Sequence, residues 1–180
     1  MRHTIDSTVA VWQYEKAGEA FLLQFRRGSD MNIMNNNTIL LVEDNPDHLE
    51  LTTLTLRENG LATNIAVARD GVEALDYLFG QGTFAGRDTR EQPKLVLLDL
   101  KLPRLSGLEV LQRVRSDPRT ACVPVVILTS SSEEEDIIAS YREGANSFVR
   151  KSVDFGEFTE KLQHLQIYWL SVNESRPVSG

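Results

Sequence analysis

The sequence predicts an α/β fold in which five parallel strands form one doubly wound sheet. Two observations lead to this prediction. From Thr38 onward, short apolar runs alternate five times with segments of helical periodicity. Such alternation is typical of a parallel sheet covered by helices on both faces, because right-handed crossovers join its strands. The chain of 180 residues, 41% of them apolar, is also long enough to bury a sizeable core.

The elements succeed one another in a regular order. Apolar runs predict strands at 38–42, 63–69, 95–98, 123–129 and 147–150. Apolar residues at helical spacing predict helices at 46–59, 72–79, 106–117, 132–144 and 154–172. A polar, glycine-rich segment at 80–93 predicts a long loop. We therefore expect a domain at 37–172, preceded by an extension at 1–36 and followed by a tail at 173–180.

The N-terminal extension has no clear link to the predicted domain. Its apolar residues favour a short amphipathic helix between Glu15 and Arg27. One interpretation is that the natural start is Met31 or Met34, so that the preceding residues are upstream sequence or a disordered appendage. The other is a partner-binding arm, and the sequence leaves both open.

Composition excludes several classes of protein. A net charge of −7 argues against a general binder of nucleic acid or anionic membranes, either of which needs a basic face. The single cysteine, Cys122, cannot form an internal disulfide, which fits a reducing compartment, and we expect it to be buried beside a strand. No apolar run reaches the roughly 20 residues of a membrane span. We expect a soluble, cytoplasmic protein.

Reactive side chains lie at the ends of four of the five predicted strands. Glu43 and Asp44 follow the first, Asp99 the third, Thr129 ends the fourth, and Lys151 follows the fifth. In a doubly wound sheet the functional site lies at the carboxyl ends of the strands. Any one of the acids, or Lys151, is alone best explained as a solvated charge, and Thr129 alone as a strand residue or a helix N-cap. Their occurrence together at one edge favours a site.

The chemistry of that site depends on its charges. Carboxylates that converge repel one another, and a hard divalent cation such as Mg²⁺ relieves the repulsion. An aspartate nucleophile that attacks phosphorus forms an aspartyl phosphate, whose charge needs a cation and hydrogen-bond donors. Lys151 would supply the cation, and the Thr129 hydroxyl and the Ser130 N–H would be the donors. His3, His48 and His164 lie far apart in the sequence, so we expect no histidine-based site.

These residues resemble a response regulator receiver domain. The segments "ILLVEDNPDH", "LVLLDLKLPRLSG", "VVILTSSSEEED" and "GANSFVRKS" are similar to its four motif blocks, in order and at family-like spacing. The resemblance covers about 37–172 and implies a (βα)₅ flavodoxin-like fold. It implies that Asp99 accepts a phosphoryl group from a histidine kinase. It also implies a set of Mg²⁺ ligands, namely Glu43, Asp44, Asp99 and the carbonyl of Lys101.

The resemblance also implies a switch. Thr129 would bind the phosphoryl group with Lys151, and its inward movement would admit Phe148, the aromatic residue three before the lysine. Lys101 and Ser131 stand where the family tunes dephosphorylation. One departure is Ser152, which replaces the proline that usually comes after the lysine, so the cis or trans state of that bond is open.

The C-terminal helix is expected to do more than close the core. One apolar stripe should face inward, while other apolar residues near its end lie off that stripe. The stripe comprises Phe158, Leu162, Leu165, Trp169 and Val172, and the others are Ile167, Tyr168 and Leu170. Core packing alone is one explanation, and a homodimer or partner surface is the one we favour. This helix and the long loop resemble regulators that partner phytochrome-type histidine kinases.

Two other functions stay open. A haloacid dehalogenase-type phosphatase or phosphotransferase also uses a strand-end aspartate and Mg²⁺. Its motif wants a second aspartate where this chain has Lys101. A degenerate receiver that acts only as an interaction module is the other, although all the site residues are present.

Overall fold

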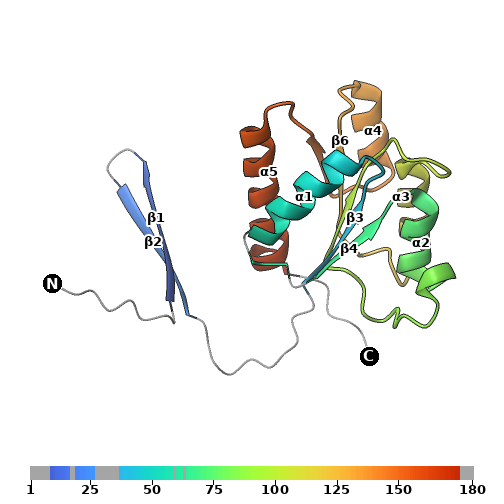
Figure 1. Ribbon diagram of the computed structural model, residues 1–180, viewed down its shortest axis with the longest axis horizontal. Helices are drawn as coiled ribbons and strands as arrows, with labels where there is room; N and C mark the ends of the chain where they lie inside the picture. Colours follow the sequence, from blue (N-terminus) through green and yellow to red (C-terminus); the bar gives the residue numbers. More distant parts are fainter. Residues whose placement is uncertain (1–8, 17–18, 27–36, 59, 63, 175–180) are drawn as a thin grey trace. The chain divides into compact units, whose positions relative to one another are not determined.

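The computed structural model describes residues 9–16, 19–26, 37–58, 60–62 and 64–174 (Figure 1). The chain divides into two compact units, Met1–Met34 and Asn35–Gly180, which we describe separately.

The first unit contains an antiparallel hairpin. β1 (Val9–Lys16) pairs with β2 (Glu19–Arg26) in a register that runs from Val9 opposite Arg26 to Lys16 opposite Glu19. The amphipathic helix predicted between Glu15 and Arg27 is therefore wrong. The physical reason is composition, since valine, tryptophan, tyrosine and phenylalanine favour strands and a short apolar run has ambiguous periodicity. The alternatives for the role of residues 1–36 lie largely outside the described residues.

The second unit is built on one five-stranded sheet in the order β4-β3-β5-β6-β7, with every neighbouring pair parallel. The strands are β3 (Thr38–Val42), β4 (Asn64–Ala68), β5 (Leu95–Leu98), β6 (Val125–Thr129) and β7 (Ser147–Arg150). This topology confirms the predicted doubly wound parallel sheet. The central strand β5 is at most 1% exposed along its whole length. That burial is expected of a parallel strand covered on both faces.

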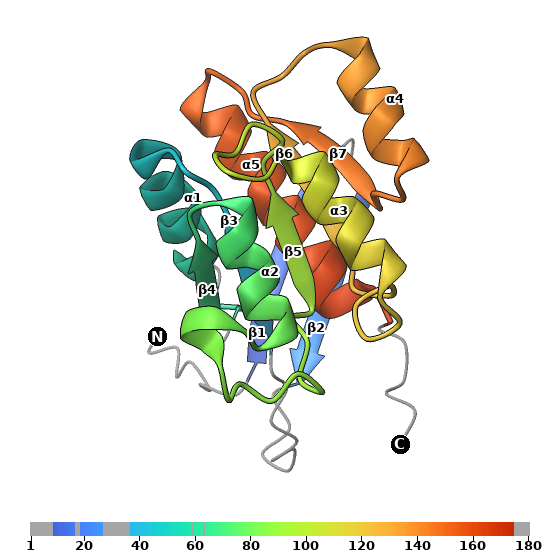
Figure 2. The same cartoon turned by 90° about the vertical axis from the view of Figure 1, so that its right-hand side faces the viewer.

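Helices cover both faces of the sheet (Figures 1 and 2). They are α1 (Pro46–Glu58), α2 (Gly71–Phe79), α3 (Gly107–Ser116), α4 (Glu134–Arg142) and α5 (Phe155–Ile167), with a short 3₁₀ turn at Gly82–Phe84. α1 and α5 pack together on one face, and α2 and α3 on the other. Each face has its own apolar core, one containing Leu40 and Leu98, the other Leu41 and Leu97, because alternate residues of a strand point to opposite sides.

The C-terminal helix changes its winding near its end. α5 continues into a π-helical turn, η2 (Tyr168–Val172). This wider turn shifts the helical phase, so Leu170 is buried whereas Val172 is 63% exposed. The predicted inward stripe is therefore correct for Phe158 and Leu162 but wrong for Val172, because an ideal 3.6-residue period does not hold to the end.

Cys122 is exposed, so the expectation of a buried cysteine is wrong. The residue lies in the turns before β6 and not beneath the sheet.

Within the part of the chain that the structure describes, no helix has the length and apolarity needed to cross a membrane.

Candidate active site at the carboxyl edge of the sheet

The site lies where the strand order reverses. From β3 the chain passes outward to β4 and then returns to β5 on the other side of β3. Val42 and Leu98 are partners in the parallel register, so the residues that come after them lie side by side. The Asp99 N–H donates to the Val42 carbonyl at 3.1 Å, and the Glu43 N–H donates to the Ala68 carbonyl at 3.0 Å. A strand-order reversal of this kind is where doubly wound folds bind ligands.

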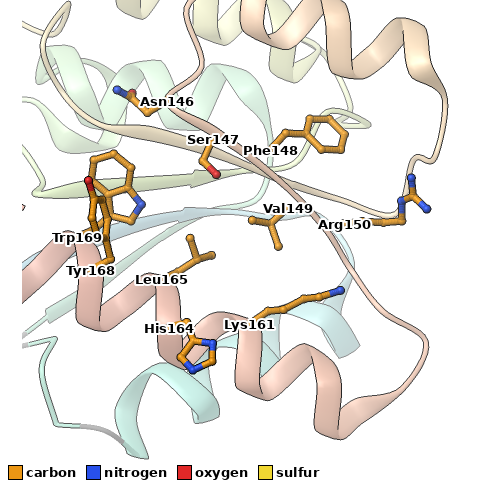
Figure 3. A pocket seen from close by; sticks show the side chains of 10 residues that line it. All are labelled: Asn146, Ser147, Phe148, Val149, Arg150, Lys161, His164, Leu165, Tyr168 and Trp169. Atoms are coloured by element: carbon orange, nitrogen blue, oxygen red, sulfur yellow. The ribbon is translucent and has the colours of Figure 1, made fainter. Parts of the chain in front are cut away.

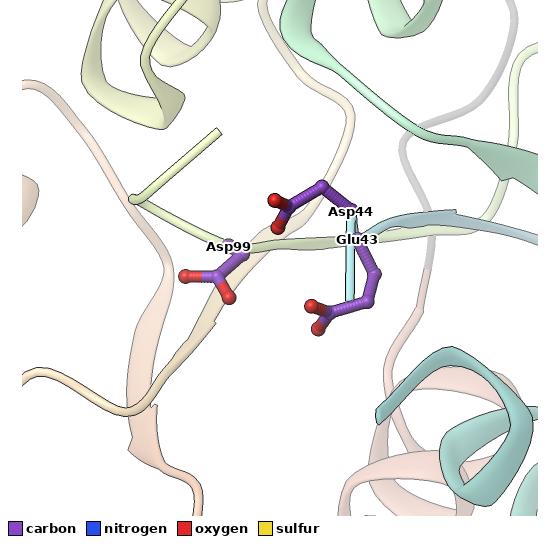
Figure 4. Close-up of side chains that lie close together, drawn as sticks. All are labelled: Glu43, Asp44 and Asp99. Carbon is purple, nitrogen blue, oxygen red and sulfur yellow. The ribbon is translucent and has the colours of Figure 1, made fainter. Parts of the chain in front are cut away.

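Three carboxylates meet at this point (Figure 4). One oxygen from each of Glu43, Asp44 and Asp99 lies within 4.8 Å of the other two. Glu43 is 1% exposed and Asp99 is 7% exposed, whereas Asp44 is exposed. Burying carboxylates together is unfavourable without a counter-charge. An all-oxygen donor set with one solvent-facing member fits a hard divalent cation that keeps some of its waters.

Lys151 supplies a positive charge to the same cluster. Its Nζ donates to Asp99 Oδ2 at 2.5 Å and to Glu43 Oε2 at 2.5 Å. Its side chain is only 5% exposed, so both ion pairs are largely shielded from solvent. Among the described peptide bonds none is cis, so the bond from Lys151 to Ser152 is trans. Three carboxylates against one ammonium still leave negative charge to be balanced.

His48 is a site residue that sequence reasoning missed. Its Nδ1 lies 3.4 Å from Lys151 Nζ and 3.7 Å from Glu43 Oε1. The distance between the histidines along the sequence gives no hint of this placement. The useful signal is a different one: His48 lies in the first turn of the helix after Glu43 and Asp44, and that turn begins at the same edge of the sheet.

The loop after Asp99 is held in a defined shape. The Lys101 N–H donates to Asp99 Oδ1 at 3.2 Å. Arg104 has a left-handed backbone, with φ of 64°, and its Nε donates to Asp70 Oδ2 at 2.8 Å. Partial burial raises the pKa of Asp70, but hydrogen bonds from the Glu73 N–H and from Arg104 outweigh burial and hold this pKa below its usual value. Asp70 therefore stays ionised and keeps the loop fastened to the start of α2.

Gly107 leads to a stability prediction for this loop. A Cβ added at Gly107 would lie 2.1 Å from the carbonyl oxygen of Asp99, which is backbone and cannot rotate away. We expect Gly107→Ala to lower the free energy of unfolding by about 2 kcal/mol, because overpacking forces the backbone to shift. Urea denaturation measures this change.

A matched control for that substitution is Gly156→Ala in the first turn of α5. There the nearest neighbour of an added Cβ is a side-chain oxygen of Asp154 at 3.3 Å, a much longer contact than the one at Gly107. Equal stability losses in the two variants would contradict the steric explanation.

Thr129 and its neighbours close the other side of the site. Thr129 is 1% exposed, and its Oγ1 accepts a hydrogen bond from the Ser131 N–H at 3.3 Å. Ser131 in turn donates from its Oγ to Asp136 Oδ2 in α4 at 2.5 Å. Ser130 and Lys101 are exposed. The loop after β6 is thus tied both to the Thr129 hydroxyl and to the next helix.

Phe148 lies on β7 and is half-buried. Its partner in the register is Ile127, two residues before Thr129 on the adjacent strand, and it packs against the core beneath α2 and α3. It points to the opposite side of β7 from Val149 (Figure 3). The predicted switch pair therefore lies on neighbouring strands.

A groove runs between β7 and the C-terminal helix (Figure 3). It has a volume of about 550 Å³, and its lining includes Val149, Arg150, Lys161, Leu165 and Trp169. The groove lies on the α5 side of the sheet and contains none of the carboxylates described above. It is therefore separate from the acidic site.

Comparison with known proteins agrees with this geometry. Residues 39–163 match the family described as "Response regulator receiver domain". The response regulator Rcp1 of Synechocystis sp. (strain ATCC 27184 / PCC 6803 / Kazusa) is 35% identical over 132 residues, which cover 73% of this chain and 88% of Rcp1. The solved structure of the bacteriophytochrome response regulator AtBRR is 50% identical, with a TM-score of 0.62, over 77% of this chain and 98% of AtBRR.

A second solved structure bears on the acidic cluster. The Mn²⁺-bound form of Rcp1 has a TM-score of 0.72 and 33% identity, over 78% of this chain and 99% of that one. The similarity thus extends over nearly the whole of these solved relatives. The comparisons support the interpretation as a response regulator and not the haloacid dehalogenase alternative. The chain belongs to the response regulator receiver domain family.

Proposed function

We propose that Asp99 is the phosphoacceptor and takes its phosphoryl group from the phosphohistidine of a sensor kinase. The observation that carries this proposal is the convergence of three carboxylates with the Lys151 ammonium, which contacts Asp99 directly at 2.5 Å. The phosphoryl group brings negative charge to this point, and the buried ammonium of Lys151 would neutralise part of that charge.

The acidic cluster would hold Mg²⁺. We assign its ligands as the carboxylates of Glu43, Asp44 and Asp99 with the carbonyl of Lys101. When bound, Mg²⁺ would neutralise charge on the transferring phosphoryl oxygens. The solved Mn²⁺-bound form of the relative Rcp1 supports a divalent ion at such a site.

The residues of the chain carry out the remaining steps. An Asp99 oxygen attacks phosphorus, the P–N bond of the phosphohistidine breaks, and its electron pair returns to the imidazole of the kinase. Lys151 gives up its contact with Asp99 Oδ2 and pairs with a phosphoryl oxygen. The Thr129 hydroxyl and the Ser130 N–H donate to the other oxygens.

The same contacts provide a signal. For Thr129 to reach the phosphoryl group, its hydroxyl must leave the Ser131 N–H, which now donates to it at 3.3 Å. Because Ser131 also contacts Asp136, this movement changes the loop that leads into α4. The space left by Thr129 would admit Phe148. We propose this pair as the switch, and Lys101 and Ser131 as the residues that set the lifetime of the phosphate.

The partner we propose is a phytochrome-type histidine kinase. Similarity to AtBRR, a bacteriophytochrome response regulator, supports this choice. The phosphoryl group would stay on the chain until it is hydrolysed, so the chain would act as a signalling phosphoprotein and not as a turnover enzyme. We propose a cytoplasmic location for it. The working unit would be residues 37–172, flanked by the extension at 1–36 and the tail at 173–180.

The end of the C-terminal helix is the proposed homodimer surface. Ile167, Tyr168 and Val172 are 45%, 50% and 63% exposed, although all three are apolar or aromatic. They lie within six residues of one another. A cluster of large apolar side chains on a helix end is typical of a protein interface.

The dimer proposal predicts a change in mass. Tyr168→Glu places a charge in the proposed interface and should convert a dimer to a monomer, measured by light scattering. Tyr168 is preferable to Trp169, which packs partly against the core. Ile138→Glu is the control, since Ile138 is 52% exposed on α4, outside the proposed surface. If the wild-type chain is monomeric even at high concentration, the proposed homodimer is wrong.

Phosphorylation itself is tested with a small donor. The chain is incubated with acetyl phosphate and Mg²⁺, and its mass is measured with and without a chelator. The mass of one phosphoryl group should appear only with Mg²⁺. No added mass on the folded wild type would contradict the proposal, and rapid turnover of phosphate esters would favour an enzyme.

A further inference from the structure

The connection between Lys151 and α5 is short, and it lacks the proline that would restrict its backbone. Only Ser152, Val153 and Asp154 separate Lys151 from the first residue of α5. The family resemblance places a proline at position 152, whose ring would fix φ there. Serine leaves that torsion free, so the backbone that carries the buried lysine needs another constraint.

The Ser152 hydroxyl provides such a constraint. Its Oγ accepts a hydrogen bond from the Asp154 N–H at 3.2 Å and donates to Glu157 Oε2 in the first turn of α5. Asp154 caps the same helix, because its Oδ1 accepts from the Glu157 N–H at 2.8 Å. The three residues form a closed set of hydrogen bonds around the connection.

Glu157 is itself held from the helix side. Its Oε1 pairs with Lys161 Nζ at 2.7 Å, one turn further along α5. The hydrogen bonds from Lys161 and from Ser152 hold the pKa of Glu157 below its usual value, so it remains an ionised acceptor. Phe158 and Leu162, at 3% and 0% exposure, fasten this part of α5 to the core. Ser152 is therefore anchored to a rigid element.

Lys151 depends on its backbone being fixed on both sides. Before it, the Lys151 N–H donates to the Thr129 carbonyl at 2.8 Å, but β7 ends at Arg150 and is an edge strand. After it, the hydrogen bonds of the Ser152 hydroxyl restrain the chain. A lysine side chain loses much rotational freedom on burial, so a loosened backbone would reduce the occupancy of its contacts with Asp99 and Glu43.

We infer that Ser152 is a positioning residue, whose hydroxyl, bound to Glu157, holds the backbone from which Lys151 reaches Asp99. This inference rests on the proposed role of Lys151 in phosphorylation. It assigns to a side chain outside the acidic site the constraint that a proline ring would otherwise supply.

The test compares variants of the whole chain. Ser152→Ala removes the hydroxyl, Ser152→Thr keeps it, Glu157→Ala removes its acceptor, and Val153→Ala changes a fully exposed neighbour. Ser152→Ala should slow phosphorylation by acetyl phosphate about fivefold, the effect of one hydrogen bond. Ser152→Thr and Val153→Ala should stay within about twofold of wild type. Because the two partners act as a unit, the Ser152→Ala/Glu157→Ala double variant should be no slower than either single variant.

A second measurement separates positioning from general loosening. The affinity for Mg²⁺, measured by calorimetry, should not fall in Ser152→Ala, because the carboxylates that hold the cation are untouched. A wild-type rate in Ser152→Ala would overturn the inference, as would equal losses of rate and Mg²⁺ affinity, or additive effects of the two single variants.

A third measurement does not depend on phosphorylation. In ¹⁵N NMR, the Lys151 ammonium should give a distinct signal in wild type that broadens or disappears in Ser152→Ala and survives in Ser152→Thr. If wild type takes up no phosphate, the proposed function fails while this comparison still decides the inference. An unchanged Lys151 signal in Ser152→Ala would refute it.

Discussion

Asp99→Asn is expected to abolish uptake of a phosphoryl group from acetyl phosphate or from a histidine kinase. An amide has no anionic oxygen to attack phosphorus, and it brings one negative charge less to the cation site. The other two acids of the cluster are Glu43, which also bonds Lys151, and Asp44, which is the exposed member. Intact-mass measurement should show no phosphorylated species after incubation with acetyl phosphate and Mg²⁺.

The matched control is Asp47→Asn. Asp47 is an exposed acid in the first turn of α1 and is not part of the carboxylate cluster. The same chemical change there should leave phosphorylation unaffected. A phosphorylated Asp99→Asn protein would mean that another residue accepts the group, and peptide mapping would identify it.

Lys151→Met is expected to have the largest effect on stability without metal. It keeps much of the side-chain volume but removes the ammonium that bonds Glu43 and Asp99, which are 1% and 7% exposed. Leaving buried carboxylates without a partner typically costs about 3 kcal/mol or more. Urea denaturation in the presence of a chelator measures the loss.

Two comparisons identify the cause of that loss. Mg²⁺ should restore part of the stability, because a bound cation replaces the missing charge and ligands that bind only the folded state stabilise it. Lys161→Met is the surface control, since its ion pair with Glu157 is half-exposed and an exposed ion pair contributes little to stability. If Lys151→Met lowers the free energy of unfolding by less than about 1 kcal/mol, or if Mg²⁺ restores none of it, the carboxylates do not need a counter-charge and the interpretation is wrong.

The sequence predicted the sheet and its edge well because both depend on a strong, local pattern. Parallel strands buried on both faces appear as uninterrupted apolar runs, and β5 is the clearest example. Once the strands are placed, the residues just beyond their carboxyl ends must meet at one edge. For this reason Glu43, Asp44, Asp99 and Lys151 could be brought together without any structure.

The features that the sequence could not predict depend on side-chain packing in three dimensions. His48 reaches Lys151 only because α1 begins beside the carboxylates, and the Ser131 contact with Asp136 depends on where α4 starts. The exposure of Val172 results from a π-helical turn that no apolar pattern revealed. The hairpin of β1 and β2 differs from the predicted helix because its apolar runs are short and their period is ambiguous.

The contacts of Lys151 have one more consequence, which concerns the order of assembly. Lys151 is separated by 108 residues from Glu43 and by 52 from Asp99, and it comes after the last strand of the sheet to be synthesised. A nascent chain that has been synthesised only as far as β6 therefore contains the acidic residues but not the ammonium of Lys151. The charges at the acidic edge are therefore completed only after β7 has been synthesised and Lys151 has followed it.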